Sequence, residues 1–165
     1  IPGVRSTGSI AVVPSVQGNG YSVNFQRGEL SAPATDTKDQ NFGFYFPLTP
    51  GTLETLGIPM LRGRPVQPGD SADAPKVAVV NQTLANALWP GADPIGRTVR
   101  LLTATPRLVT VVGVAADVKD VNFNRKTRPQ LFVPAAQMPV RSMVAVARTS
   151  IDASALIPAI RAAIR

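Results

Sequence analysis

The chain has 165 residues, 44% of them hydrophobic, and contains no cysteine and no histidine. This length suits one domain with a sizeable core, and the two missing residue types exclude disulfides, thiol and imidazole nucleophiles, Ser-His triads and ordinary zinc sites. The formal net charge is +7, but the basic residues are scattered singly, which indicates a solvated basic surface and argues against nucleic-acid binding.

The N-terminal part of the chain predicts strands separated by polar loops. The apolar residues of Ile10 to Val13 and the alternating pattern of Tyr21 to Phe25 each indicate a strand, and the turn-forming stretch Gln17 to Gly20 favours a hairpin between them. We expect a surface loop at Arg27 to Gln40 and a further strand in the aromatic stretch Phe42 to Leu48.

A short helix is expected directly after these strands. Thr49 can act as its N-cap, and Pro50 suits the first helical position because the N–H that proline lacks would be unpaired there. Gly57 should end the helix in a left-handed conformation. Leu53 and Leu56 would then face the core.

The middle of the chain predicts a buried strand and a second helix. The apolar run Val77 to Val80 is typical of a buried strand. Asn81 can cap a helix from Gln82 to Leu88, which Trp89 and the following Pro-Gly pair would stop.

The remaining elements are mostly strands. Turn residues between Thr98 to Leu102 and Leu108 to Val118 predict that these two strands form a hairpin. Leu131 to Val133 and Met143 to Ala147 add two more strands, and Asp152 can cap a terminal helix. Together the elements predict an α+β fold, a mostly antiparallel sheet with about three short helices on one face. No apolar run approaches the roughly 20 residues of a membrane-spanning helix. From the length of the chain we expect a single domain over residues 1–165.

Arg62 and Arg64 form the first candidate site. Guanidinium groups bind carboxylate or phosphate through paired hydrogen bonds, so the two arginines could clamp an anion or contact a partner. Ion pairs to Asp70 or Asp73 are the alternative. The pattern favours these ion pairs, because a phosphate-binding loop would place glycines before a helix, and here the helix precedes the arginines.

Trp89 is the second candidate, either as a ligand-stacking or interface anchor or as a lid that packs its helix onto the sheet. The latter is the commoner role. The acidic pairs Asp70 with Asp73 and Asp117 with Asp120 lack the ligand density of a calcium loop, so we expect them to form turns and charge pairs. The sequence therefore predicts no catalytic residue, no metal ion and no cofactor.

Five blocks of sequence carry a family resemblance. They are LTPGTLETLGIPMLRGR (Leu48 to Arg64), VAVVNQTLANALWPGADPIGRTVR (Val77 to Arg100), VTVVGVAADVKD (Val109 to Asp120), RPQLFVPAAQ (Arg128 to Gln137) and DASALIPAIRAAIR (Asp152 to Arg165). Together they resemble the extracytoplasmic, MacB-like periplasmic core domain of MacB/FtsX-type ABC-transporter permeases.

This resemblance implies a place and a role. The domain would lie on the periplasmic side of the bacterial inner membrane, between transmembrane helices of the same polypeptide, and would act indirectly with a cytoplasmic ATP-binding subunit or domain. Its role would be non-catalytic: to couple ATP-driven movement of the membrane helices to substrate export or to partners, such as a second permease copy or an extracytoplasmic protein. The family also implies two lobes, a porter-like lobe of residues 1–61 with 129–165 and an inserted lobe of residues 62–128.

The alternative is a different class of protein. A freestanding extracytoplasmic module could bind a small anionic ligand near Arg62 and Arg64. That hypothesis predicts a concave pocket with converging arginines, whereas the permease hypothesis predicts chain ends that emerge side by side and face a membrane.

Overall fold

The computed structural model describes residues 2–14, 20–28, 41–118 and 127–158. Within these ranges the chain forms a connected nine-stranded sheet, two α-helices and a C-terminal 3₁₀ turn. The predicted α+β class is confirmed, although two α-helices are present where about three were expected.

Six of the strands close into a barrel. Their order around it is β2 (Tyr21–Arg27), β6 (Thr98–Leu101), β7 (Arg107–Ala115), β5 (Val77–Asn81), β8 (Gln130–Pro134) and β3 (Asn41–Leu48), and β3 then pairs with β2. β3 is parallel to β8 and β5 is parallel to β7, whereas the other neighbours are antiparallel. The sheet is therefore mostly antiparallel, as predicted, but its mixed pairing and its closure were not. The predicted β6–β7 hairpin is confirmed.

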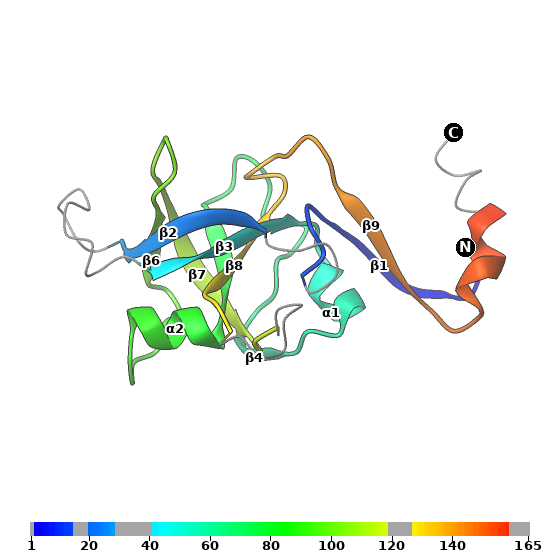
Figure 1. The fold of residues 1–165 in the computed structure, drawn as a ribbon, viewed down its shortest axis with the longest axis horizontal. Coiled ribbons are helices and arrows are strands. Elements are labelled where there is room, and N and C mark those ends of the chain that lie inside the picture. The colour runs from blue at the N-terminus through cyan, green and yellow to red at the C-terminus, as the bar shows by residue number, and fades with distance from the viewer. Residues whose placement is uncertain (1, 15–19, 29–40, 119–126, 159–165) are drawn as a thin grey trace.

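Three strands lie outside the barrel: β1 (Val4–Ile10), β4 (Met60–Gly63) and β9 (Val144–Thr149). β4 pairs with β7, while β1 and β9 pair with each other and extend away from the barrel as a two-stranded ribbon, which we call the arm (Figure 1). The hairpin predicted between Ile10 to Val13 and Tyr21 to Phe25 is wrong. β1 pairs with β3 and β9, and β2 pairs with β3 and β6, because the apolar face of β2 is buried only if its strand closes the barrel.

The two helices cover different parts of the sheet. α1 (Thr52–Leu56) packs against β1 and β9, and α2 (Gln82–Leu88) packs against β3, β5, β7 and β8. The prediction that the helices share one face is wrong for a physical reason. The sheet has two separate apolar surfaces. Leu53 of α1 packs on one of them, and Leu84 of α2 packs on the other.

The helix ends follow local chemistry in part. Asn81 caps α2 as predicted, with its Oδ1 accepting a hydrogen bond from the Leu84 N–H at 2.9 Å. Gly57 ends α1 with φ of 73°, also as predicted. The N-cap of α1 is Gly51 and not Thr49, because the Thr49 hydroxyl is engaged with β1.

The C-terminal element differs from its prediction. Asp152 accepts a hydrogen bond from the Ser154 N–H at 2.9 Å and caps a 3₁₀ turn, Ala153–Leu156. Residues 159–165 of the predicted terminal helix lie outside the described residues.

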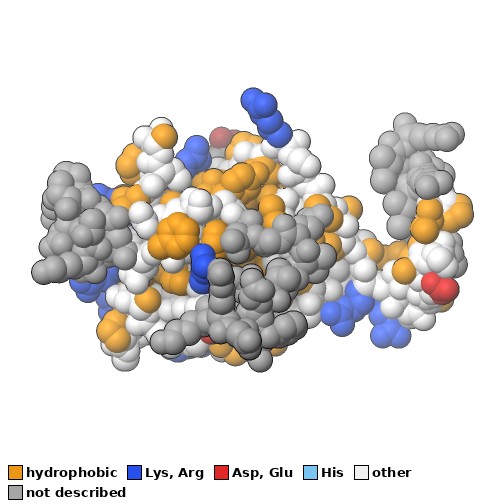
Figure 2. Space-filling model, viewed as in Figure 1, with side chains coloured by type: hydrophobic (Ala, Val, Ile, Leu, Met, Phe, Trp, Pro, Cys, Tyr) orange, Lys and Arg blue, Asp and Glu red, His pale blue; other side chains and the backbone are white. Residues whose placement is uncertain are grey.

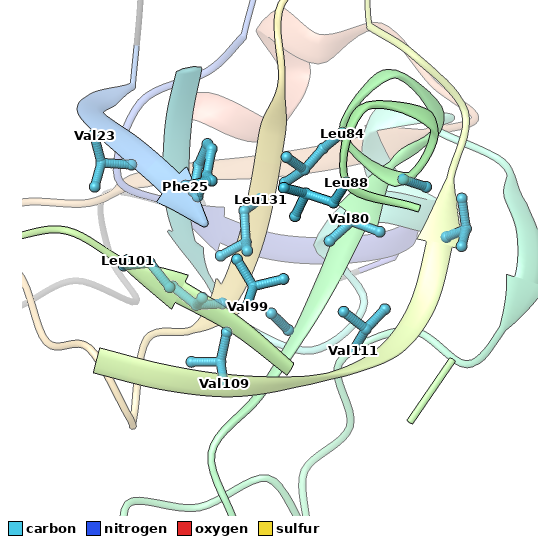
Figure 3. Packing of buried hydrophobic residues seen from close by; sticks show 14 of the residues in the cluster. Val23, Phe25, Val80, Leu84, Leu88, Val99, Leu101, Val109, Val111 and Leu131 are labelled. Atoms are coloured by element: carbon cyan, nitrogen blue, oxygen red, sulfur yellow. The ribbon is translucent and has the colours of Figure 1, made fainter. Parts of the chain in front are cut away.

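The core has two layers separated by the barrel wall. The barrel cluster fills the interior and includes the ten residues labelled in Figure 3: Val23, Phe25, Val80, Leu84, Leu88, Val99, Leu101, Val109, Val111 and Leu131. The outer cluster lies between the wall and α1 and consists of Ile10, Phe44, Phe46, Leu48, Leu53, Val66, Val79, Ala115 and Phe132.

Strands β5 and β8 are buried along their whole length because each faces both clusters. Val80 and Leu131 point into the barrel, whereas their chain neighbours Val79 and Phe132 point outward. There Phe46 stacks on Phe132 with ring centroids 5.6 Å apart. Two covered faces explain why these strands are continuously apolar in sequence.

Strand β7 changes face midway. Val109 and Val111 belong to the barrel cluster, and so does Val114 further along, which breaks the alternation of period two. Val112 is the extra residue of a bulge in the pairing of β7 with β5. An inserted residue turns the side chains that follow to the opposite face of the strand. A strict alternation read from the sequence therefore assigns the residues after Val112 to the wrong face.

Candidate functional site at the base of the arm

The predicted residue Arg64 is held by an ion pair. Its Nη1 and Nη2 donate to the two carboxylate oxygens of Asp70, both at 2.8 Å, and the Gln67 N–H donates to the same carboxylate at 2.8 Å. The Arg64 hydrogen bond holds the pKa of Asp70 below its usual value, and Asp70 raises the pKa of Arg64. Arg64 thus closes the loop after β4, and Arg62 lies exposed on β4.

Trp89 lies at the C-terminal end of α2, buried within the barrel cluster at 4% exposure. Its indole Nε1 is buried and has no hydrogen-bond partner among the described residues. Here Trp89 packs its helix onto the strands.

Asp117 has a structural role that sequence reasoning missed. Its carboxylate accepts hydrogen bonds from the Thr83 N–H at 2.9 Å and the Thr83 hydroxyl at 2.8 Å, so it ties the end of β7 to the start of α2. Asp120 lies outside the described residues. Within the described part of the chain, no group of three or more acidic side chains is arranged to hold a metal ion.

The arm brings an N-terminal strand and a C-terminal strand of the chain together. Val4 pairs with Thr149 near its tip and Ile10 pairs with Val144 near its base. Beyond the ladder, the Ser150 N–H donates to the Gly3 carbonyl at 2.9 Å. Figure 1 shows the arm extending away from the barrel, so the outer ends of β1 and β9 lie side by side at a distance from it. The chain ends themselves lie outside the described residues, and their emergence side by side facing a membrane stays a prediction.

A threonine pair fastens the base of the arm to the barrel. The Ser9 N–H lies 2.8 Å from the Thr49 hydroxyl oxygen and 3.1 Å from that of Thr52, and the Thr52 hydroxyl lies 3.1 Å from the Ser9 carbonyl oxygen. The Thr49 N–H also donates to the Ser9 carbonyl at 2.9 Å. These bonds join the arm to the end of β3 and the start of α1.

Strand β9 is held to the same helix by an arginine. Nε and Nη2 of Arg148 each donate to the Thr55 carbonyl oxygen at 3.2 Å, a contact between residues 93 positions apart. On β1, Gly8 lies so close to α1 that a Cβ there would be 2.3 Å from the Thr52 hydroxyl oxygen. We call Gly8, Ser9, Thr49, Thr52, Thr55 and Arg148 the clamp.

The clamp attaches both strands of the arm to the rest of the molecule. Its hydroxyl, backbone and guanidinium groups hold β1 to α1 and to the end of β3, and hold β9 to α1. Sequence reasoning identified Thr49 only as a helix cap. The close spacing of Thr49, Thr52 and Thr55 was the available signal, but the strand that they bind is distant in sequence.

Among the described residues, no helix is long and apolar enough to cross a membrane. A sequence model of the family described as MacB-like periplasmic core domain matches residues 5–163. No curated protein sequence matches the chain.

Three solved structures have a similar fold. The periplasmic region of MacB from Actinobacillus actinomycetemcomitans is 14% identical, with a TM-score of 0.64 over 99% of this chain and 67% of that one. A domain of a putative permease protein from Porphyromonas gingivalis is 16% identical, with a TM-score of 0.63 over 99% of this chain and 70% of that one. The extracellular domain of the noncanonic ABC-type transporter YknZ from Gram-positive bacteria is 15% identical, with a TM-score of 0.59 over 94% of this chain and 70% of that one.

Proposed function

Because the chain belongs to the family of MacB-like periplasmic core domains, it is a non-catalytic periplasmic domain of a MacB-like ABC transporter permease, and we propose that its arm couples movement of the permease's membrane helices to the barrel. ATP hydrolysis by a cytoplasmic subunit or domain would drive that movement. The barrel would pass it to the exported substrate, to a second permease copy or to an extracytoplasmic partner.

The observation that carries this proposal is the double attachment of the arm. The outer ends of β1 and β9 lie side by side at its tip, and both strands are tied to α1 at its base, β1 through Ser9 and β9 through Arg148. Membrane helices joined to the two ends would pull on both strands together. The paired backbone hydrogen bonds of the ribbon would resist shear between the strands, so the load would reach α1 and the outer cluster.

The barrel supplies a stiff body on which such a load can act. Its strands are closed into a ring and its interior is filled by the barrel cluster, and packed interiors transmit displacement with little compression. The two-lobe division, residues 1–61 with 129–165 and residues 62–128, stays a prediction. It assigns β2, β3 and β8 to one lobe and β5, β6 and β7 to the other, so the two lobes would share the barrel. Separate unfolding transitions for the two segments would support the division, and a single cooperative transition would contradict it.

Spin-label distances in the full-length permease test the coupling. The described chain has no cysteine, so Ile151→Cys near the arm tip and Ala87→Cys on the exposed face of α2 can be labelled after any cysteines elsewhere are replaced. The permease would be reconstituted in nanodiscs with its ATP-binding subunit. We expect the 151–87 distance to stay narrow with and without ATP, while the exposure of position 151 to a lipid-soluble relaxing agent changes with nucleotide.

A clamp variant supplies the internal comparison. Arg148→Met should broaden the 151–87 distance distribution, whereas Arg141→Met, which changes an exposed arginine just before β9, should leave it unchanged. A broad distribution in the wild type, or a label at position 151 that is no nearer the lipid than the label at position 87, would refute the proposal.

A further inference from the structure

Different elements cover the two ends of the barrel. β5 begins at Val77 and ends at Asn81, where α2 starts, so α2 covers the end at which β5 finishes. The register of β5 with parallel β7 places Ala115 at that same end. At the other end, where β5 begins, lie the β6–β7 turn, the segment between β8 and β9 and the loop that leads into β5, whose Pro75 carbonyl accepts a hydrogen bond from Gln137. We call this end the barrel mouth.

The barrel mouth is hollowed. A cavity of about 350 Å³ opens there, and its walls include the buried residues Val77, Val109, Val133 and Met138. A second hollow of about 280 Å³ adjoins it through the shared lining residue Arg107 and reaches Tyr45. The combined volume is in the range of small-molecule sites, which are mostly apolar with a few polar groups.

The charged side chains that line this cavity are cationic. Lys76 and Arg107 line it, and no described lining residue of either hollow is acidic. Within the described chain, Arg107 makes one long hydrogen bond, 3.4 Å from Nη1 to the Gln137 carbonyl oxygen, which leaves guanidinium donors available to a ligand. Figure 2 shows Lys and Arg side chains at several places on the face in view, two of them side by side below the arm.

Lys76 also has a partner within the protein, since its Nζ donates to the Ala72 carbonyl, and Gln137 holds the mouth in shape. The Gln137 Oε1 accepts from the Val77 N–H at 3.0 Å, and its Nε2 donates to the Pro75 carbonyl at 3.0 Å. Tyr45 stacks on Tyr21, with ring centroids 5.2 Å apart. Burial and Tyr21 raise the pKa of Tyr45, so its phenol stays protonated and can donate to an anion.

We propose that the barrel mouth binds a small amphiphilic anion, an aliphatic chain that ends in a carboxylate or sulfate. The aliphatic chain of the ligand lies on Val109, Val133 and Met138, and its anionic head accepts hydrogen bonds from Arg107 with Lys76 nearby. Leu108, which is 49% exposed and lines the same cavity, also packs on the aliphatic chain. This site is separate from Arg62 and Arg64, and it stands whether or not the arm couples membrane movement.

Decanoate, used below its micelle concentration, is the first probe. Isothermal titration of the 165-residue chain should show saturable binding, with decanol binding at least about tenfold more weakly because it lacks the charge-assisted bond. Arg107→Gln should weaken decanoate binding about tenfold and Lys76→Gln about threefold. Arg141→Gln removes the same charge from an exposed arginine that lines neither hollow, and it should change the affinity by less than about twofold.

A pair of leucine variants tests the apolar part of the site. Leu108→Glu places a carboxylate at the cavity and should abolish decanoate binding. Leu61→Glu alters a leucine on β4 that is equally exposed, 49%, and lies outside the cavity, so binding should persist. No saturable binding by the wild type, or equal losses in Arg107→Gln and Arg141→Gln, would overturn the proposal, because the attraction would then be absent or a matter of net charge alone.

Vesicles distinguish the source of the ligand. If phosphatidylglycerol vesicles bind the chain and Arg107→Gln removes that binding, the anion is a lipid at the bilayer surface. If the vesicles do not bind while decanoate does, the ligand is a soluble amphiphile. Vesicle binding without decanoate binding would refute the site.

Discussion

The barrel and the arm are built from the same kind of strand, but their strands are protected in different ways. In the barrel every strand has a neighbour on both edges, and β5 and β8 are also covered on both faces. In the arm, Ile10 is the fully buried residue of β1 and the side chains of β9 are half-buried or exposed. The barrel is therefore stabilised by apolar burial, and the arm by its hydrogen-bond ladder and the clamp.

This difference has a consequence for movement. Segments with few buried apolar contacts open at lower free energy than the core around them. The arm should therefore open at a lower free energy than the barrel, and the clamp is what keeps it attached in the folded state. The following predictions test the contrast, in order of decreasing effect.

The outer cluster should tolerate truncation far less well than the arm. Phe132 is fully buried and stacked on Phe46, so Phe132→Ala should lower the free energy of unfolding by about 3–5 kcal/mol. Val146→Ala, in half-buried β9, should cost less than about 1 kcal/mol. Urea unfolding measures both, and comparable losses would contradict the contrast.

Asn81 should be the most sensitive polar residue of the barrel. It is fully buried, and its Oδ1 accepts from the N–H groups of Leu84 and Gln130, both at 2.9 Å, while its Nδ2 donates to the Arg128 carbonyl at 3.0 Å. Asn81→Ala would leave these groups unpaired and should cost about 2–3 kcal/mol in urea unfolding. Asn86→Ala, on the exposed face of the same helix, should change stability by less than about 0.5 kcal/mol, and a similar loss there would show that the buried hydrogen bonds of Asn81 are not the cause.

A methyl group on Gly8 should loosen the arm and spare the barrel. Its Cβ would lie 2.6 Å from the Thr52 Cα, a backbone atom that cannot rotate away. We expect Gly8→Ala to cost about 1–3 kcal/mol and to speed amide hydrogen exchange in β1 and β9 but not in β5. Gly69→Ala, where a Cβ would meet no heavy atom within 4 Å, is the matched control and should leave stability and amide exchange unchanged. Faster exchange throughout the molecule would show that arm and barrel open together.

The smallest effect concerns pH. Arg64 lowers the pKa of Asp70 in the folded chain below the ordinary 3.8, so this ion pair stabilises the protein above that pH and its contribution is lost as the pH falls through the folded value. Asp70→Asn and Arg64→Gln should therefore be less stable than wild type at pH 7, and the difference should shrink below about pH 4. Thermal unfolding across this range measures it. A difference independent of pH would place the effect in packing rather than in charge.

Several parts of the fold could be predicted because their causes are local. Asn81 and Gly57 act on backbone groups within a few residues, and the β6–β7 hairpin joins strands separated by a short turn. The apolar runs of β5 and β8 reflect burial on both faces. These interactions need no knowledge of distant partners.

The candidate site was predicted less well, since its contacts are distant in sequence. Thr49 has the chemistry of a cap, but it bonds to Ser9, 40 residues away. Arg148 looks like any surface arginine until β9 lies beside α1. Arg64 was recognisable because its partner Asp70 is six residues away.

The sequence by itself determined the family, the α+β class, the position of most strands and the absence of cysteine and histidine chemistry, since these follow from composition, periodicity and short motifs. Only the tertiary structure decided that six strands close into a barrel and that β1 pairs with β9 to form the arm. It also decided that the clamp joins the arm to the barrel. A period of two tells which side chains share a face of a strand, but it says nothing about which strand lies next to it. That choice depends on how all the apolar faces of the chain can be buried together.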